Sequence, residues 1–303
     1  MTGRAAAPAP HALQTTSTES AARRRAAACL LALACVLAGW AGAGRVAAQR
    51  DLTPLQHEIN VQTARLSSAD AEERRDAVTR LGAMARPEAS RAAARALGDA
   101  SAVVRATAAR AVLSLGPGEA PALILPLLRD RDEFARREAA YALGLTRSAL
   151  ALEALSAALA ADKQPSVRGA AAVALGQIGD AAAVPALTGA LTRRLRAPGF
   201  FNRIRRRKVE EDEFVRRAAA VALGQIGSRE AVPVLVEALS DARAPNDVRR
   251  EAARALGLIG DPAAAPALRA VLTHGDPYLS RVAFEALKRL DPASATRPAG
   301  GRL

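Results

Sequence analysis

The sequence VRGAAAVALGQIG at residues 167–179 recurs at residues 215–227 as VRRAAAVALGQIG. Twelve of the thirteen positions are identical, and the one difference places Gly169 opposite Arg217. Looser copies of this frame begin at residues 73, 104, 135, 248 and 279, so that seven copies follow one another in steps of 31, 31, 32, 48, 33 and 31 residues. Such a period is typical of proteins in which each unit stacks on its neighbours. The sequence therefore predicts a solenoid of about seven units.

Each unit carries the pattern of two helices. In the fourth unit, apolar residues between Val167 and Ile178 recur with the 3.6-residue period of a helix, and Gly179 then tolerates a left-handed C-terminal cap. A second apolar face follows, with Pro185 near its start, where a missing N–H costs nothing. We interpret Gly176 and Gly179 as helix punctuation and not as a phosphate-binding loop. We expect burial between repeats for the large apolar residues of the two matching copies, which are Leu175, Ile178, Leu223 and Ile226.

The pattern D…VR..AA.ALG.IGD..A.P.L..AL resembles HEAT repeats, and in particular the short repeats of the phycobilisome-lyase-like (PBS lyase) kind. The resemblance extends over about residues 68–291. It implies an all-α fold, a right-handed α-solenoid of about seven HEAT-like helix hairpins. Asp99, Asp130 and Asp162 each lie six residues before an arginine. We expect these aspartates to cap the first helix of each unit and the arginines to pair with them or with a neighbouring turn.

Residues 1–48 have the order of a secretory signal peptide. The basic cluster 23–25 precedes an apolar run at 26–43, and Val46-Ala47-Ala48 supplies small residues before Gln49. The alternative is an uncleaved membrane anchor. We expect an exported protein, periplasmic or secreted, that is free of cysteine after cleavage, because Cys29 and Cys35 both lie in this segment.

Three further segments follow the signal peptide. Residues 49–67 are expected to form an N-terminal capping helix that begins with the capping box Thr53-Pro54-Leu55-Gln56. The solenoid is expected over residues 68–292. Residues 293–303 are rich in Pro, Ala, Gly and Arg without periodicity, which predicts a disordered tail.

The 48-residue step contains a basic insert at about residues 193–213. It holds a run of cations without an acid, then the acidic run Glu210 to Glu213. We expect residues 196–212 to project as a loop or helical extension whose cationic half contacts an acidic partner. In the alternative, the acids fold back on the cations or cap the helix that begins near Phe214. The candidate partner-binding residues are Arg196, Phe200, Phe201, Arg203, Arg205, Arg206, Arg207 and Lys208.

The sequence contains no recognisable catalytic or metal-binding constellation. Its histidines, His11, His57 and His274, are widely spaced, and we expect no cofactor and no metal. His57-Glu58 is the only His-Glu pair, whereas deoxyhypusine hydroxylase, a HEAT-like enzyme, holds iron with several such pairs. We predict a non-enzymatic scaffold that binds a protein partner.

Two other functions remain open at this stage. One is a lyase-like or lyase-accessory factor resembling the phycobilin lyase subunits. The other is a solenoid that binds an anionic polymer or nucleic acid through the basic insert, since the chain carries a net charge of +13. An export signal disfavours a nucleic-acid partner. A membrane is expected as a partner only if the N-terminal segment is not cleaved.

Overall fold

The computed structural model describes residues 53–196, 208–273 and 275–290. The chain divides into two compact units after His57, and helix α2 (Pro54–Arg65) crosses this boundary. In the first unit the predicted capping box is confirmed. The Thr53 N–H donates to the Gln56 side chain and the Gln56 N–H donates to the Thr53 hydroxyl, both at 3.3 Å. These two bonds satisfy N–H groups that have no partner inside the helix.

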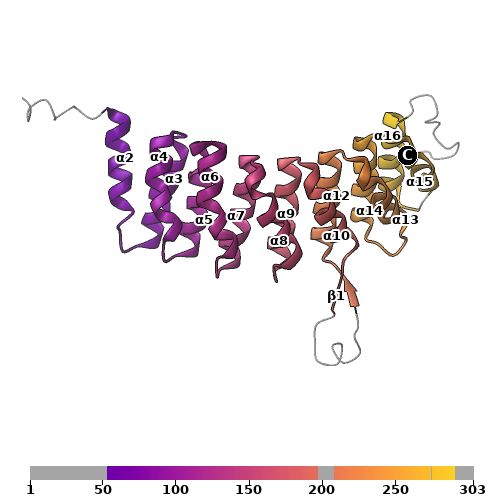
Figure 1. Cartoon of the computed structure of the whole chain (residues 1–303), viewed down its shortest axis with the longest axis horizontal. Coiled ribbons are helices and arrows are strands. Elements are labelled where there is room, and N and C mark those ends of the chain that lie inside the picture. The colour runs from indigo at the N-terminus through magenta and orange to yellow at the C-terminus, as the bar shows by residue number, and fades with distance from the viewer. Residues whose placement is uncertain (1–52, 197–207, 274, 291–303) are drawn as a thin grey trace, which may run out of the picture. The chain divides into compact units, whose positions relative to one another are not determined.

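The second unit is a stack of helix hairpins, which confirms the predicted all-α solenoid. Figure 1 shows its helices side by side in chain order. The first helices of the successive repeats are α3 (Ala71–Ala83), α5 (Ala102–Ala111), α7 (Glu133–Thr146), α9 (Pro165–Ile178), α12 (Glu213–Ile226), α14 (Asn246–Ile259) and α16 (Pro277–Leu290). Each of them packs against the next one along the chain.

The second helix of each hairpin is short and is flanked by 3₁₀ turns. These helices are α4 (Pro87–Ala93) with η1 (Ala94–Gly98), α6 (Gly116–Ile124) between η2 (Leu113–Leu115) and η3 (Leu125–Arg129), α8 (Leu152–Ala161) after η4 (Ala149–Ala151), α10 (Val184–Thr192) after η5 (Ala181–Ala183), α13 (Val232–Ser240) after η6 (Arg229–Ala231), and α15 (Ala265–Ala270) after η7 (Pro262–Ala264). From α6 onward, each packs against the first helix of the following repeat. The seventh repeat is described only as far as α16, its first helix.

Helix ends in the central repeats follow the sequence signals. Gly179, Gly227 and Gly260 have φ between 73° and 77°, and each donates its N–H to a carbonyl four residues earlier. Pro185 and Pro233 lie in the first turn of α10 and α13. Glycine and proline therefore punctuate these helices for the predicted reasons.

The core is made of Ala, Leu and Val side chains between adjacent repeats. Leu175 and Leu223 are completely buried, as predicted. Ile178 and Ile226 are only partly buried, because each lies in the last turn of its helix, directly before the glycine cap at the edge of the stack. The prediction of burial between repeats therefore holds only in part for these two residues, which pack against the core with one side.

Gly176 is not helix punctuation. It lies inside α9, and a Cβ atom built on it would be 2.8 Å from Cα of Ala222 in α12. Gly144, Gly224 and Gly257 face an alanine of the next repeat at 2.7–2.9 Å in the same way. The glycine of the A-L-G motif is thus the point at which neighbouring first helices come closest, and any side chain there would separate the repeats.

Residues Ala102–Arg129 form the one described segment that is long and apolar enough to cross a membrane. They comprise α5, η2, α6 and η3, with a break at Gly116, where φ is 87°. Core residues such as Val104 and Ile124 lie within this segment. The segment is the helix hairpin of the second repeat, and both of its helices pack against α7 of the third.

Alanine substitutions at two helical glycines distinguish the effect of close helix packing from the effect of helix propensity. In Gly176→Ala the new methyl would collide with Ala222, and we expect a loss of about 1–3 kcal/mol in the free energy of unfolding, the usual cost of overpacking. Gly189 in α10 has open space around its Cα. Gly189→Ala should therefore stabilise the protein by roughly 0.5–1 kcal/mol through helix propensity. Chemical denaturation of both variants tests this, and equal effects in the two would contradict the packing role of Gly176.

Candidate functional site

A row of arginine–aspartate pairs runs along the turns between repeats. Arg105 in the first turn of α5 donates through Nε and Nη2 to the two carboxylate oxygens of Asp130, each at 2.7 Å. Its Nη1 donates to the carbonyls of Asp99 and Ala100, at 2.8 and 3.0 Å. The side chains of Arg105 and Asp130 are each only 8% exposed. One arginine therefore joins its own inter-repeat turn to the next.

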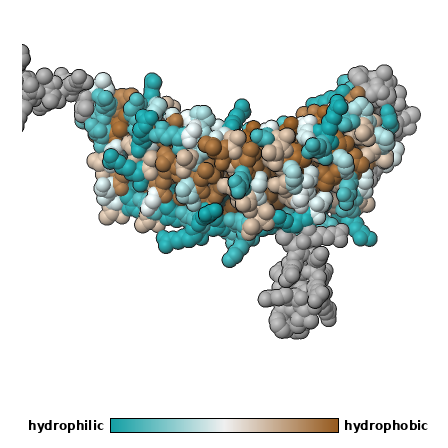
Figure 2. Space-filling model, in the orientation of Figure 1, coloured by the Kyte–Doolittle hydropathy of each residue, from teal (hydrophilic) through white to brown (hydrophobic). Residues whose placement is uncertain are grey.

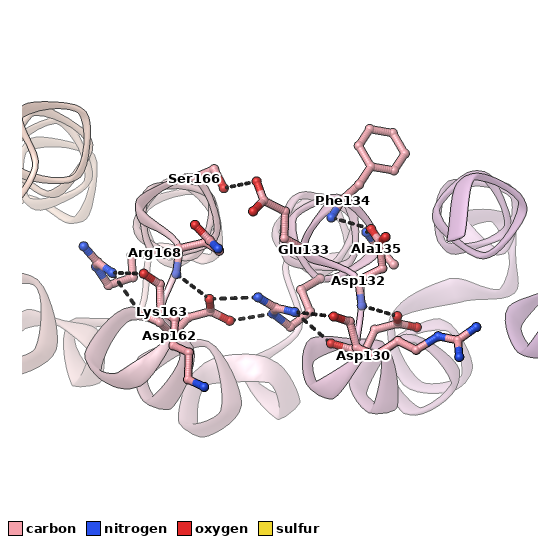
Figure 3. Close-up of polar contacts among 12 residues, drawn as sticks. Asp130, Asp132, Glu133, Phe134, Ala135, Asp162, Lys163, Ser166 and Arg168 are labelled. Carbon is pink, nitrogen blue, oxygen red and sulfur yellow. Dashed lines mark hydrogen bonds and ion pairs between the residues drawn. The ribbon is translucent and has the colours of Figure 1, made fainter. Parts of the chain in front are cut away.

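The same arrangement recurs on either side of this pair, and we call the row the arginine ladder. Arg74 binds Asp99 with donor–acceptor distances of 2.7 and 2.8 Å, and Arg136 binds Asp162 at 2.7 and 3.1 Å. Figure 3 shows the rung at Asp162, whose guanidinium also donates to the Asp130 carbonyl. The bidentate geometry is the strong form of a guanidinium–carboxylate bond. The predicted pairing with a neighbouring turn is confirmed.

The expected capping role of the ladder aspartates was wrong. Asp99, Asp130 and Asp162 each accept from the N–H two residues later, at 2.8–2.9 Å, and this N–H belongs to the N-cap residue of the helix and not to the helix itself. These contacts close a tight turn before the helix. The carboxylates point to the preceding arginine, because the turn places them across the boundary between repeats.

The ladder shifts the titration of its members. The hydrogen bond from Arg74 holds the pKa of Asp99 below its ordinary value, and the hydrogen bond from Arg105 does the same for the pKa of Asp130. The matching bonds raise the pKa of Arg74 and Arg105. In all of them the charged form is the one that the partner stabilises.

At the fourth rung a glutamate from the insert replaces the aspartate. Arg168 donates to the two carboxylate oxygens of Glu211, from Nε at 3.1 Å and from Nη2 at 2.5 Å. The Glu211 side chain has no exposed surface, and Arg193 also contacts it at 3.3 Å. The Glu211 N–H donates to the Arg193 carbonyl at 2.9 Å. The two ends of the insert therefore meet at a buried ion cluster that continues the ladder.

The base of the insert is a β-hairpin, which corrects the expectation of a loop or helical extension there. Strands β1 (Arg194–Arg196) and β2 (Lys208–Glu210) pair antiparallel, with Leu195 opposite Val209 and Arg196 opposite Lys208. Figure 1 shows β1 leaving the stack at the edge where α10 ends and α12 begins. Figure 2 shows hydrophilic residues along this edge.

Two of the candidate partner-binding residues lie within the described part of the chain, and six lie outside it. Arg196 and Lys208 are the paired residues at the end of the hairpin base. The others lie outside the described residues: Phe200, Phe201, Arg203, Arg205, Arg206 and Arg207. Their role stays a prediction.

The acidic run after the insert serves the fold. Asp212 is the N-cap of α12 and accepts from the Phe214 N–H at 2.9 Å, so the predicted capping role is confirmed. Glu210 pairs with Arg216, and Glu211 forms the fourth rung. Sequence spacing alone would have selected Glu210 as the ladder residue, because it lies six residues before Arg216. The structure uses the next residue instead, because Glu211 follows directly after the hairpin and faces Arg168.

The fifth rung is rearranged. Arg216 donates to the Leu191 carbonyl at 3.2 Å and to Glu210 on the hairpin. Asp241 occupies the position that would accept from it by analogy with Asp130, yet among the described side chains Asp241 has no ion-pair partner. A pocket of about 100 Å³ lies between the hairpin base and α13, lined by both residues. The insert thus supplies the acid of the fourth rung, and its hairpin base binds Arg216 in place of Asp241 at the fifth.

The sequence profile of HEAT repeats matches residues 59–144, 120–197 and 198–288. The chain belongs to the HEAT-repeat family. No protein of curated function matches it in sequence.

Three solved structures resemble this chain to different degrees. The Escherichia coli protein YibA aligns with a TM-score of 0.53 and 19% identity, over 78% of this chain and 81% of YibA. The CpcE–CpcF complex of phycocyanin lyase from Nostoc aligns with a TM-score of 0.45 and 25% identity, over 76% and 86% of the two chains. Human deoxyhypusine hydroxylase aligns with a TM-score of 0.36 and 23% identity, over 77% and 96%. These likenesses concern the fold. In the described part of this HEAT-repeat protein, no group of three or more His, Cys, Asp or Glu residues could hold a metal ion.

Acid should weaken the HEAT-repeat stack through the ladder. The pKa values of Asp99 and Asp130 are lower in the folded protein than in the unfolded chain. Their contribution to the free energy of unfolding is therefore complete at pH values above the range in which an ordinary aspartate titrates. It is lost as pH falls through the lowered values. We expect the free energy of unfolding to decline below about pH 4, and Asp130→Asn to lose about 3–5 kcal/mol at pH 7 by leaving Arg105 unpaired.

Denaturant titrations from pH 7 to pH 2 measure both effects. The variant should show a shallower dependence on pH than the parent in the acid range. Asp180 is half-buried and has no ion pair among the described residues, so it provides a control as Asp180→Asn. An equal pH dependence in the parent and in Asp130→Asn would contradict the role of the ladder.

Proposed function

We propose that this HEAT-repeat protein is an exported, non-enzymatic scaffold that binds a protein partner, and that the basic insert contacts an acidic surface of that partner. The observation that carries the proposal is the hairpin base. The stack presents the insert on β1 and β2 and anchors its return through the buried Glu211. Repeats on both sides keep complete cores, since Leu191 and Val215 are buried directly before and after it.

The charges support a binding role for the insert. The sequence from Arg193 to Lys208 contains eight cations and no acid. Of these, Arg193 is used by the fold, where it binds Glu211 and the Leu159 carbonyl. The acids that follow are engaged in the base of the insert and at the start of α12. Among the described side chains, Arg193 is the cation of this run that an acid of the insert neutralises. The cationic composition of the run suits a partner with an acidic surface.

The location of the described residues with shifted pKa values also agrees with a scaffold. The groups with shifted pKa values include Asp99, Asp130, Asp162 and the arginines that bind them. Asp276, which binds Arg250, belongs to the same row. Shifted pKa values often mark active sites, but here these pairs join one repeat to the next. HEAT repeats generally mediate protein interactions, in agreement with the proposal.

Removal of the insert tip tests this function. Because Arg196 pairs with Lys208, residues 197–207 can be replaced by Asn-Gly, which favours a two-residue hairpin turn. We expect an unchanged melting temperature, since β1, β2 and Glu211 remain. Capture of the partner from an envelope fraction should be lost. Mass spectrometry of the captured protein and its release by salt provide the readout.

A charge-neutral variant controls for the length of the insert. Substitution of Arg203, Arg205, Arg206 and Arg207 by Gln keeps the length and should also abolish capture. Capture that survives in both variants would refute the role of the insert. Nuclease-sensitive binding would instead indicate a nucleic-acid partner and would overturn the proposal of an acidic protein.

Export makes a separate prediction. Cleavage after Ala48 would leave Gln49 as the first residue, with Cys29, Cys35 and Trp40 removed. N-terminal sequencing of the protein from periplasmic or secreted fractions measures this directly. A product that retains the arginine cluster 23–25 would contradict cleavage and would favour the N-terminal anchor.

A further inference from the structure

A groove crosses helix α9 next to the point where the chain returns from the insert to α12. Its volume is about 480 Å³, and it is lined by Arg137, Glu138 and Tyr141 of α7, Pro165 and Ser166 of α9, and Asp212 and Phe214 at the start of α12. We call it the α9 groove. It spans three successive first helices, and its lining residues come from the third, fourth and fifth repeats.

The groove exists because the fourth repeat carries small residues where its neighbours carry large ones. Ser166 stands where the third and fifth repeats have Phe134 and Phe214, and Gly169 stands where the fifth has Arg217. A Cβ atom built on Gly169 would be 2.0 Å from the Phe214 ring. The single difference between the two matching sequences therefore makes room for Phe214 to lie over α9.

Aromatic side chains gather at this groove although the chain is only 3% aromatic. Tyr141 and Phe214 line it, each partly buried, from the two helices that flank α9. Phe134 lies beside it and carries the guanidinium of Arg137 at 5.0 Å from the ring centre. A second such pair, Arg250 over Tyr278 at 5.2 Å, occurs in the last repeats. Stacking of a guanidinium on an aromatic ring is thus already used twice in this protein.

One carboxylate of the lining, Asp212, and two beside lining residues, Glu133 and Glu213, have no ion pair among the described residues, in contrast to the net charge of +13. Glu133 accepts from the Ser166 hydroxyl at 3.2 Å, a contact that Figure 3 shows bridging α7 and α9. Asp212 accepts only from the Phe214 N–H, and Glu213 follows it in the first turn of α12. None of the three pairs with an arginine or lysine among the described residues. The one cation in the lining, Arg137, is matched by Glu138 at 3.3 Å.

We propose that the α9 groove binds an arginine side chain presented by an extended segment of a partner protein. The guanidinium plane would lie against Tyr141 or Phe214 and would donate to the carboxylates at the mouth of the groove. Arginine suits this site better than lysine, because its planar group both stacks and forks onto carboxylates. This site goes beyond the proposed function, since it selects a basic segment whereas the insert selects an acidic surface. The two proposals can fail independently.

Fluorine NMR of the full chain offers a direct test. The sequence contains two tyrosines, Tyr141 and Tyr278, so 3-fluorotyrosine labelling gives two signals that Tyr278→Phe assigns. The probe is the blocked peptide acetyl-Gly-Ala-Arg-Ala-Gly-amide. We expect a saturable shift of the Tyr141 signal and no shift at Tyr278, whose ring already carries Arg250. The same peptide with citrulline, which has the shape of arginine without its charge, should bind at least tenfold more weakly.

Variants separate recognition from stability. Asp212→Ser keeps an N-cap oxygen for α12 and removes the charge, and Glu133→Gln keeps the acceptor for Ser166. Each should weaken the peptide about tenfold with unchanged helical circular dichroism. The control Asp180→Ser, the same change at the cap of η5, should leave binding unchanged.

Three results would overturn the proposal. They are equal binding of the citrulline peptide, equal shifts at the two tyrosines, and unchanged affinity in both groove variants. A Tyr141 shift that depends on protein concentration without peptide would assign the groove to a second copy of the chain. Loss of insert-dependent capture has no bearing on these outcomes, because the probe contains no acid.

Discussion

The structure depends on a bond that each of the first four repeats makes with the next across a turn. Helices α3, α5 and α7 each carry one arginine of the ladder near their start. It donates to carbonyls of the turn before its own helix and to the carboxylate in the turn before the next repeat. A hairpin of Ala, Leu and Val cannot cover its apolar face alone, and its stability comes from the neighbour. The arginine fixes where that neighbour sits, because a bidentate pair tolerates little change in distance or direction. The ladder therefore converts a nonspecific apolar contact into a defined register.

The insert shows how this bond accommodates extra chain. Residues added between α10 and α12 lengthen the connection between the fourth and fifth repeats, but this extra chain does not interrupt the ladder. Instead the hairpin brings its ends together, and Glu211 reaches the arginine from the end of β2. The first helices α9 and α12 keep the close contact between Gly176 and Ala222. The insert is thereby attached to the stack without changing the spacing of the repeats.

The few differences between the fourth and fifth repeats have a consequence at the surface. Small residues let first helices pack closely, and where they reach the surface they leave a hollow. Gly169 and Ser166 produce such a hollow over α9, which Phe214 and Tyr141 border. The protein thus has two candidate contact surfaces of opposite character, a cationic insert and an aromatic groove with carboxylates. A scaffold that holds two different partners, or two parts of one, would need this arrangement.

The sequence alone determined the repeat period, the two-helix unit, the glycine caps and the capping box at Thr53, because these features rest on local pattern and backbone preference. It also located the insert, since a break in a regular period is visible without a structure. The tertiary structure decided the roles that depend on a neighbour. Only contact with Ala222 explains Gly176, only the offset of the hairpin selects Glu211 over Glu210, and only the position of Phe214 explains why residue 169 is glycine. The physical reason is that a solenoid buries its surface between units, so the partner of a residue lies about one repeat away in the sequence. The pattern within one unit carries no information about that partner.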